Sequence, residues 1–309
     1  MEPFSQLSLA TAAAVATLMS IRGAKRKSLT NHGAIAAWIV GFLSIACGLR
    51  GFLLLLFYVV SAQFGFIAMS NARFSFNHKA FFKIGTKATK YKVQQKSLLD
   101  RSADESSCRG PNQVLACSVL GVVIQLVHVI YCGNEKSIDF SKDSLASSLT
   151  CALIAHHSTN LGDTLASELG ILSKSEPILI TSGRRVPRGT NGGVTLLGTV
   201  FSAVGGVVIG VGVLVLDMIS ELDAKPLAYI AFGATCGVIG SITDSLLGAT
   251  MQATHYDEKK GCVHSCRNNN DSPSTVHISG KNFVTNAQVN VISVIITSAF
   301  GFIMGPIYF

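Results

Sequence analysis

The stretch GGVTLLGTVFSAVGGVVIGVGVLVL, residues 192–216, contains no charged side chain. About 20 apolar residues in a helix cross the roughly 30 Å hydrocarbon core of a bilayer. Water is absent from that core, so a segment that crosses it must satisfy its own backbone hydrogen bonds, as a helix does. The stretch therefore predicts a transmembrane helix.

The composition of the 309-residue chain agrees with a membrane protein. Hydrophobic residues make up 49% of the chain, charged residues make up 14%, and the mean hydropathy is +0.45. Because soluble domains carry about a quarter charged residues, this composition excludes an ordinary soluble globular protein.

Other apolar runs of similar length occur along the chain. The clear ones are Phe4–Ile21, Gly33–Cys47, Phe52–Met69, Asn112–Tyr131, Gly192–Leu216, Leu227–Met251 and Val289–Phe309. A weaker run, Leu145–Asn160, is short and contains His156 and His157. We predict an all-α fold, a polytopic membrane helix bundle of about eight transmembrane helices that forms one integral membrane domain over residues 1–309. The alternative is seven helices, without the weaker run.

The distribution of basic residues favours eight spans. With eight, the connections 22–32, 70–111, 161–191 and 252–288 fall on one side and hold 4, 9, 4 and 4 Lys and Arg residues, 21 of the 25 in the chain. The other side keeps only Arg50, Lys136, Lys142 and Lys225. Because cytoplasmic connections are enriched in Lys and Arg, we expect 70–111 to be a basic cytoplasmic segment and 252–288 a cytoplasmic loop. Both termini are then expected on the non-cytoplasmic side.

Topology also accounts for the net charge of +8. Basic connections set the orientation and attract anionic lipid headgroups, so we expect the lipid bilayer, and no nucleic acid, as a partner. A role for some of the lysines in binding phosphate is the alternative. The expected location is an endomembrane or the plasma membrane.

The stretch NLGDTLASELG, residues 160–170, places two acids at the cytoplasmic end of the weaker run. On a helix, Asn160, Asp163 and Ser167 share a face. The small residues Gly162, Ala166 and Gly170 permit close approach of neighbouring helices. Acids at membrane depth are costly and face polar cavities or partners, so a metal ion or a basic phosphate-binding group is expected nearby. The alternative is a solvated helix end.

A second acid lies in GVIGSITDSLLGAT, residues 237–250, on the seventh predicted span. Here Ser241, Asp244, Ser245 and Gly248 form a small, polar stripe, at the same membrane level as Asp163. Two carboxylates from different helices suit a hard cation such as Mg²⁺, with phosphate oxygens and water as further ligands. Packing between helices is the alternative, but it does not account for the carboxylate.

The segment RRVPRGTNGGVTLLGT, residues 184–199, joins three arginines to a glycine-rich turn before the sixth span. A helix N-terminus offers free N–H groups to an anion, and arginine adds bidentate contacts to phosphate. The turn lacks the Gly-Lys-Ser/Thr ending of a Walker A loop. Beside the two acids, it predicts a site that handles phosphate.

Two further clusters have alternative interpretations. Lys281, Asn286, Gln288 and Asn290 stand before or within the start of the last span, where they either bind a headgroup or cap the helix. The sequence CVHSC, residues 262–266, lies between His255 and His277 and contains zinc-ligand residue types. Its spacing is not that of a zinc finger, and the neighbouring NNNDSPS favours a polar loop.

Five segments together resemble the transmembrane protein 19 family, also known as domain of unknown function 92. They are KATKYKVQQKSLLD (87–100), NLGDTLASELG (160–170), VPRGTNGGVTLLGT (186–199), GSITDSLLGATMQ (240–252) and NAQVNVIS (286–293). The resemblance covers essentially the whole chain. The family includes the phytyl-phosphate kinase of plants and cyanobacteria. The order of GDTLAS and GTNGG is also similar to that in dolichol and phytol kinases and phosphatidate cytidylyltransferases, which use CTP or its relatives with Mg²⁺.

The resemblance implies roles for individual residues. Asp163 and Asp244 would be catalytic metal or phosphate ligands, and Glu168 would be a third catalytic acid. Residues implied in substrate or phosphate binding are Lys87, Lys90, Asn160, Ser167, Arg188, Gly189, Thr190, Gly192, Gly193 and Asn290.

The leading functional hypothesis is a cytoplasm-facing, Mg²⁺-dependent phosphotransferase. Its substrates would be an isoprenoid alcohol or isoprenoid monophosphate and a nucleoside triphosphate, CTP or ATP. Catalysis of this kind depends mostly on positioning and charge neutralisation. The alternatives are a membrane transporter, with a polar path through His156 and the two acids, and a non-enzymatic membrane protein.

Overall fold

A computed structural model describes residues 2–25, 28–51, 53–55, 110–220, 222–259, 262–264 and 275–309. Most of the predicted span Phe52–Met69 lies outside these residues, as does the predicted basic segment 70–111 apart from its last two residues. Lys87 and Lys90 therefore also lie outside the described part of the chain.

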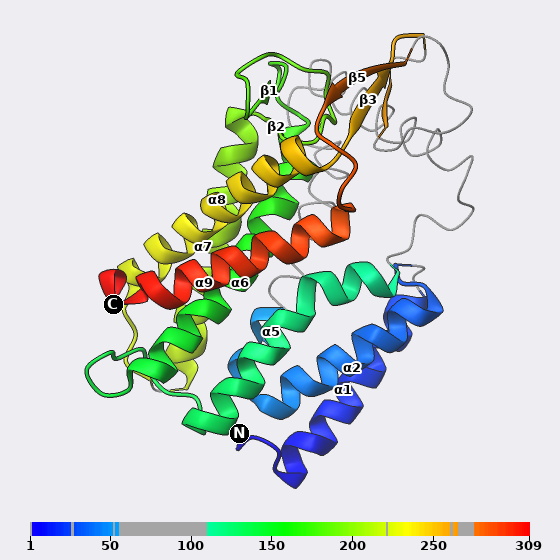
Figure 1. Cartoon of the computed structure of the whole chain (residues 1–309). Helices are drawn as coiled ribbons and strands as arrows, with labels where there is room; N and C mark the ends of the chain where they lie inside the picture. The colour runs from blue at the N-terminus through cyan, green and yellow to red at the C-terminus, as the bar shows by residue number, and fades with distance from the viewer. Residues whose placement is uncertain are drawn as a thin grey trace, which may run out of the picture.

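The described chain is built mainly of long helices (Figure 1). They are α1 (Gln6–Lys25), α2 (Asn31–Cys47), α5 (Pro111–Cys132), α6 (Ser144–Gly170), α7 (Leu196–Ile219), α8 (Pro226–Met251) and α9 (Asn286–Tyr308). Each predicted span in this part coincides with one helix. Five of the helices, α1, α5, α7, α8 and α9, are long and apolar enough to cross a membrane. The prediction of a polytopic helical membrane protein is confirmed.

Helix α6 corresponds to the weaker predicted run and is the longest of these helices, with 27 residues. It packs against α5, α7, α8 and α9, and every position from Ala146 to Gly162 is buried. Because protein surrounds this helix, it can carry polar residues that a helix facing lipid could not. Its weak hydropathy therefore follows from its central position.

Small residues let α6 approach its neighbours closely. A Cβ atom added to Gly162 would lie 2.9 Å from Gly237 Cα of α8 and 2.9 Å from Ser202 O of α7. Three helices therefore meet one residue before Asp163, as the stretch NLGDTLASELG predicts.

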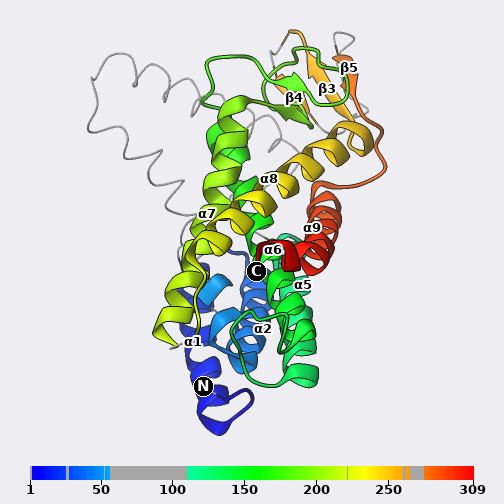
Figure 2. The ribbon, with the colours of Figure 1, turned by 90° about the vertical axis from the view of Figure 1, so that its left-hand side faces the viewer.

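Short strands lie at one end of the bundle, and Figures 1 and 2 show this from two sides. Strand β1 (Ile178–Leu179) pairs antiparallel with β2 (Gly193–Val194). Strands β3 (Thr254–Asp257), β4 (Cys262–His264) and β5 (Thr275–Ser279) form an antiparallel sheet in the order β4-β3-β5. The connection 252–288, expected as a loop, thus contains a sheet that joins α8 to α9.

The opposite end of the bundle holds the connections from α5 to α6 and from α7 to α8. Asp223 N donates to Ser137 Oγ at 2.9 Å and joins the two connections. Lys225 Nζ donates to Phe309 O at 2.9 Å and ties the end of the chain to the start of α8. The pair α1 and α2 packs through α2 against α5.

Candidate functional site

A partly enclosed cavity of about 290 Å³ lies at the strand-bearing end of the bundle, between α6, α7, α8 and the segment 188–195. Asp163 and Ser167, which the sequence places on one face of α6, line one wall together with Ala166 and Gly170. The opposite wall contains Ser241, Ile242, Asp244, Ser245 and Gly248 of α8. The sequence patterns of these two helices therefore converge on one space.

The two carboxylates at this cavity interact with each other electrostatically and with neighbouring polar groups. Asp163 accepts a hydrogen bond from Ser241, and Asp244 is close enough to Asp163 to influence its charge. Ser293 Oγ donates to Asp244 Oδ2 at 3.4 Å. Within the described ranges, neither carboxylate forms an ion pair with a basic side chain.

Asn290 also supports Asp244, from α9. With its amide oriented to satisfy both neighbours, Asn290 Nδ2 donates to Asp244 Oδ2 and to Asn286 O, both at 3.1 Å. Asn286 itself lines the cavity. The structure therefore places Asn290 behind Asp244, where it holds the carboxylate.

The glycine-rich turn closes the cavity from the side of the strands. Gly189 and Gly192 have positive φ angles of 90° and 76°, which glycine adopts readily. A Cβ atom on Gly192 would lie 2.5 Å from Ser245 O and 2.8 Å from Ala249 Cα, so the turn rests directly on α8. Glycine is thus required here by both conformation and space.

The backbone of this turn is already hydrogen-bonded at several amides. Thr190 N donates to Pro187 O at 3.2 Å and Gly193 N donates to Thr190 O at 3.0 Å. Asn191 N donates to Thr254 Oγ1 of β3 at 3.3 Å. These amides are not available to cradle a phosphate as in a Walker A loop, so anion binding would fall mainly to Arg188 and the surrounding hydroxyl groups.

Arg188 brings positive charge to the rim of the cavity. Its Nη1 donates to Ile171 O at 2.8 Å and its Nη2 donates to Lys174 O at 3.3 Å. These bonds tie the guanidinium to the end of α6. Arg188 lines the cavity, and a guanidinium is suited to bidentate contacts with phosphate.

Helix α7 begins later than predicted, at Leu196 rather than Gly192. Strand β2 stands between the turn and the helix, and Thr195 caps the helix, its Oγ1 accepting from Gly198 N at 3.0 Å. Thr195 and Gly198 line the cavity. The N-terminal end of α7, which is the positive end of the helix dipole, therefore borders the cavity. One amide at this end, that of Gly198, is already bonded to the Thr195 cap.

Besides Asn290, which lies behind Asp244, two predicted residues lie outside the cavity lining. Asn160 is buried against α5, where its Nδ2 donates to Cys117 O at 3.1 Å and to His156 O at 3.0 Å. Glu168 follows Asp163 by five positions, about 140° further around the helix, and is not among the lining residues.

Sequence reasoning missed several polar residues that line the cavity, among them Thr199 and Ser202 of α7, Ser175 after α6 and Gln252 after α8. The first two continue a stripe with Thr195 at helical spacing. Polar residues at helical spacing identified Asp244 on α8, and the sequence of α7 contains the same kind of pattern.

The donor set of the cavity fits Mg²⁺. Two carboxylates from different helices, with hydroxyl and amide groups around them, offer the oxygen ligands of a hard cation. Among the described residues, no group of three His, Cys, Asp or Glu side chains is arranged to hold a metal ion. Two protein carboxylates with substrate phosphates are a usual arrangement for Mg²⁺.

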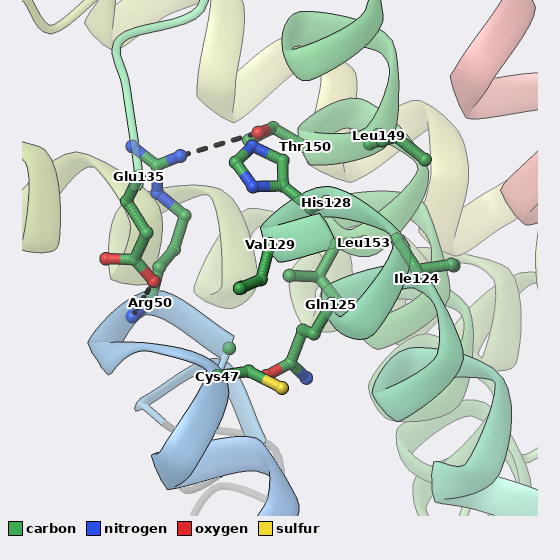
Figure 3. Close-up of a pocket in the computed structure, with 11 residues that line it drawn as sticks. Cys47, Arg50, Ile124, Gln125, His128, Val129, Glu135, Leu149, Thr150 and Leu153 are labelled. Atoms are coloured by element: carbon green, nitrogen blue, oxygen red, sulfur yellow. Dashed lines mark hydrogen bonds between the residues drawn. The ribbon is translucent and has the colours of Figure 1, made fainter. Parts of the chain in front are cut away.

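A second, much smaller cavity, of about 30 Å³, lies toward the opposite end, between α2, α5 and α6. Figure 3 shows Arg50, Glu135 and His128 around it, with the guanidinium directed toward Thr150. The volume is sufficient for about one water molecule. This cavity is too small for a substrate.

Arg50 is the centre of a buried polar network at this second cavity. Its Nη2 donates to Asp217 Oδ1 at 2.7 Å and to Lys136 O at 2.9 Å. Tyr229 donates its hydroxyl hydrogen to Asp217 Oδ2. Arg50 is 4% exposed and Asp217 is 1% exposed, so the segment after α2 meets α7 and α8 at a buried ion pair.

The fold and the larger cavity define a polytopic helical membrane protein with two acids in a polar cavity at one end of its bundle. The chain belongs to the family described as integral membrane protein DUF92, whose model matches residues 62–298.

Several proteins are similar to this chain along most of its length. Protein PGR of Arabidopsis thaliana is 30% identical over 305 residues, 96% of each chain. An uncharacterized membrane protein of Methanocaldococcus jannaschii is 26% identical over 78% of this chain and 79% of its own. Protein VTE6 of Arabidopsis thaliana, a chloroplastic protein, is 27% identical over 65% of this chain and 54% of its own. No solved structure matches the chain significantly.

Proposed function

We propose that this protein is a Mg²⁺-dependent phosphotransferase that acts on an isoprenoid alcohol or an isoprenoid monophosphate, with its site facing the cytoplasm. The observation that carries the proposal is the convergence of Asp163 and Asp244, from two different helices, on one cavity that Arg188 also lines. The similarity to the family that contains phytyl-phosphate kinase supports an isoprenoid substrate and CTP or ATP as the phosphate donor.

The residues of the cavity would have different roles in phosphoryl transfer. Bound Mg²⁺ would supply positive charge to neutralise the phosphate oxygens, and Asp163 and Asp244 would hold it. Ser241, Ser293 and Asn290 orient these carboxylates. Arg188 would bind the phosphate from the rim and exclude wrong orientations.

The position of the cavity also suits a lipid substrate. Ile242 lines the cavity and is 43% exposed. The wall formed by α8 therefore presents an exposed apolar side chain beside the polar groups of the cavity. An isoprenoid headgroup would enter beside this wall and leave its apolar chain in the lipid.

A specific observation also favours transport as a second candidate. The polar residues His156, His157, Ser158 and Thr159 continue from the cavity into the middle of α6, and all are buried. Buried polar residues within a membrane bundle mark ion or proton paths in some proteins.

The experiment that tests the proposed function uses purified protein in detergent with Mg²⁺ and labelled CTP or ATP. The acceptors are phytyl, farnesyl and geranylgeranyl alcohols and their monophosphates. We expect a labelled prenyl phosphate or diphosphate, formed at least about 100-fold more slowly by Asp163→Asn and Asp244→Asn. Asp223→Asn, an exposed acid at the opposite end, is the matched control and should keep the wild-type rate.

Two outcomes would overturn the proposal. The first is folded wild-type protein that gives no product with any donor and acceptor, which would favour transport. The second is product formation at the wild-type rate by either acid variant, because the reaction would then not depend on the cavity.

A further inference from the structure

Two buried polar atoms of α5, Gln125 Oε1 and His128 Nε2, have no hydrogen-bond partner among the residues that the structure describes. Both residues line the second cavity. Gln125 is 6% exposed and His128 is 8% exposed. Because a buried polar atom without a partner is costly, these two atoms indicate that the cavity accommodates a small polar ligand.

One ligand can reach both atoms. Gln125 and His128 are three positions apart on α5, and residues at this spacing are neighbours on one face of a helix. Figure 3 shows both side chains around the cavity, together with Arg50 and Thr150.

The hydrogen-bonding character of the two atoms limits what the ligand can be. The amide oxygen of Gln125 only accepts. The imidazole of His128 forms a hydrogen bond with the backbone of Gly133. Since Gly133 N already donates to Val129 O, the carbonyl of Gly133 accepts from the ring, and Nε2 of the neutral ring then keeps its lone pair. The ligand therefore needs two hydrogens to donate.

Arg50 adds a donor on another side of the cavity. Its Nη1 makes only a long hydrogen bond, of 3.4 Å, to Thr150 Oγ1, so the guanidinium can also donate to a ligand. A ligand that donates twice and also accepts is matched by water, and the cavity of about 30 Å³ holds about one water molecule. An ammonium ion has no lone pair for Arg50 and would add positive charge beside the guanidinium.

We propose that the second cavity binds one ordered water molecule, which donates to Gln125 Oε1 and His128 Nε2 and accepts from Arg50. The water connects α5 to the buried ion pair of Arg50 and Asp217, so it extends the polar network at this end of the bundle. Two polar side chains on an apolar helix are thereby satisfied. This inference does not depend on the proposed reaction.

X-ray radiolysis of the full-length protein in detergent tests the proposal, because radicals formed from a bound water oxidise the side chains beside it. Cys47 lines the cavity and is 2% exposed, whereas Cys151 is 0% exposed and lies outside the lining. Mass spectrometry detects the oxidised cysteines. We expect oxidation of Cys47 and not of Cys151, and loss of the Cys47 signal in the double variant Gln125→Leu with His128→Leu.

The matched control is His32→Gln, at an exposed histidine of α2, which should keep the Cys47 signal of the wild type. Equal oxidation of Cys47 and Cys151 in the wild type would refute the site. An unchanged Cys47 signal in the double variant would also refute it, because the water would then not depend on the two side chains.

A second measurement covers the case in which the double variant fails to fold. A structure of the wild-type protein at a resolution that shows ordered water would place the molecule directly. One peak at about 2.7–3.2 Å from both Gln125 Oε1 and His128 Nε2 supports the proposal. A map that shows other buried water molecules and none between these two atoms would overturn it.

Discussion

The two ends of the helix bundle each place acids on apolar helices, but they surround them differently. At one end, Asp217 forms an ion pair with Arg50 and accepts a hydrogen bond from Tyr229. At the other, Asp163 and Asp244 face a cavity of about 290 Å³ and have no basic partner among the residues that the structure describes. The first end is internally balanced, whereas the second has room for the cation that we propose.

The basic residues at the end that holds Arg50 and Asp217 also have partners. All four that the charge pattern assigns to that side contact a neighbour. Lys136 pairs with Asp143 at 2.8 Å, Lys142 pairs with Asp139 at 2.9 Å, and Lys225 donates to Phe309 O. A buried ion pair whose hydrogen bonds are satisfied holds its helices in one arrangement. Two acids beside a cavity, without a basic partner among the described residues, are typical of a binding site. We therefore call the first the structural end and the second, where we propose the site, the functional end.

The largest effect on stability is expected from Arg50→Ala at the structural end. Removal of one partner of a buried ion pair typically costs about 3–5 kcal/mol, because the other charge stays buried and uncompensated. Thermal unfolding in detergent measures the loss. The double variant Arg50→Met with Asp217→Leu, which leaves no unpaired charge, should recover most of it. Equal loss in both variants would contradict the role assigned to the ion pair.

The next largest effect is expected from Gly192→Ala at the functional end. Its Cβ would meet Ser245 O and Ala249 Cα of α8 at a positive φ angle. We expect a loss of roughly 1–3 kcal/mol from overpacking, and a larger relative loss of activity. Gly183→Ala is the matched control, because Gly183 has a φ angle of 67° and open space around it. If both substitutions cost the same, backbone strain alone explains the effect.

A small effect on stability is expected from Asp244→Asn, in contrast to Arg50→Ala. The asparagine keeps an oxygen acceptor for Ser293, and it relieves repulsion between two neighbouring carboxylates. The free energy of unfolding should stay within about 1 kcal/mol of the wild type or rise. Because a bound ion stabilises the folded state, Mg²⁺ should raise the Tm of the wild type and not of the variant. A fall as large as that of Arg50→Ala would make Asp244 a structural residue instead.

Sequence patterns predicted the helices well because each outer helix must present an apolar surface to lipid. The predicted run Leu227–Met251 and helix α8, Pro226–Met251, differ by one residue. Helix α6 gave a weak signal because protein surrounds it. Asp163 and Asp244 could be predicted because their spacing and membrane level are local properties of each helix.

Other features depend on contacts that a local pattern does not contain. Arg50 and Asp217 are 167 positions apart, and nothing near either residue specifies the other. Asn160 shares the polar stripe of Asp163, but the neighbouring α5 binds its side chain. The sheet β4-β3-β5 depends on the register of three short strands, which the segment 252–288 does not reveal by composition.

The smallest effect is expected from Glu135→Gln at the structural end. Glu135 lies in the connection after α5, and its Oε1 accepts from Arg50 N at 2.6 Å. Burial raises the pKa of this carboxyl group above its ordinary value, and this outweighs the opposing charge of Arg50. Where the raised pKa keeps Glu135 protonated, Arg50 and Asp217 form one balanced pair.

The sign of the resulting pH dependence follows from this raised pKa. The stability that Glu135 contributes is present below the ordinary pKa of glutamate and is lost as the pH rises through its raised value in the folded protein. Because Glu135→Gln does not titrate, the Tm of the variant minus that of the wild type should increase from about pH 4.5 to about pH 8. A difference that decreases over this range would show that Arg50 keeps the carboxylate ionised, so the structural end would then hold two acids for one cation.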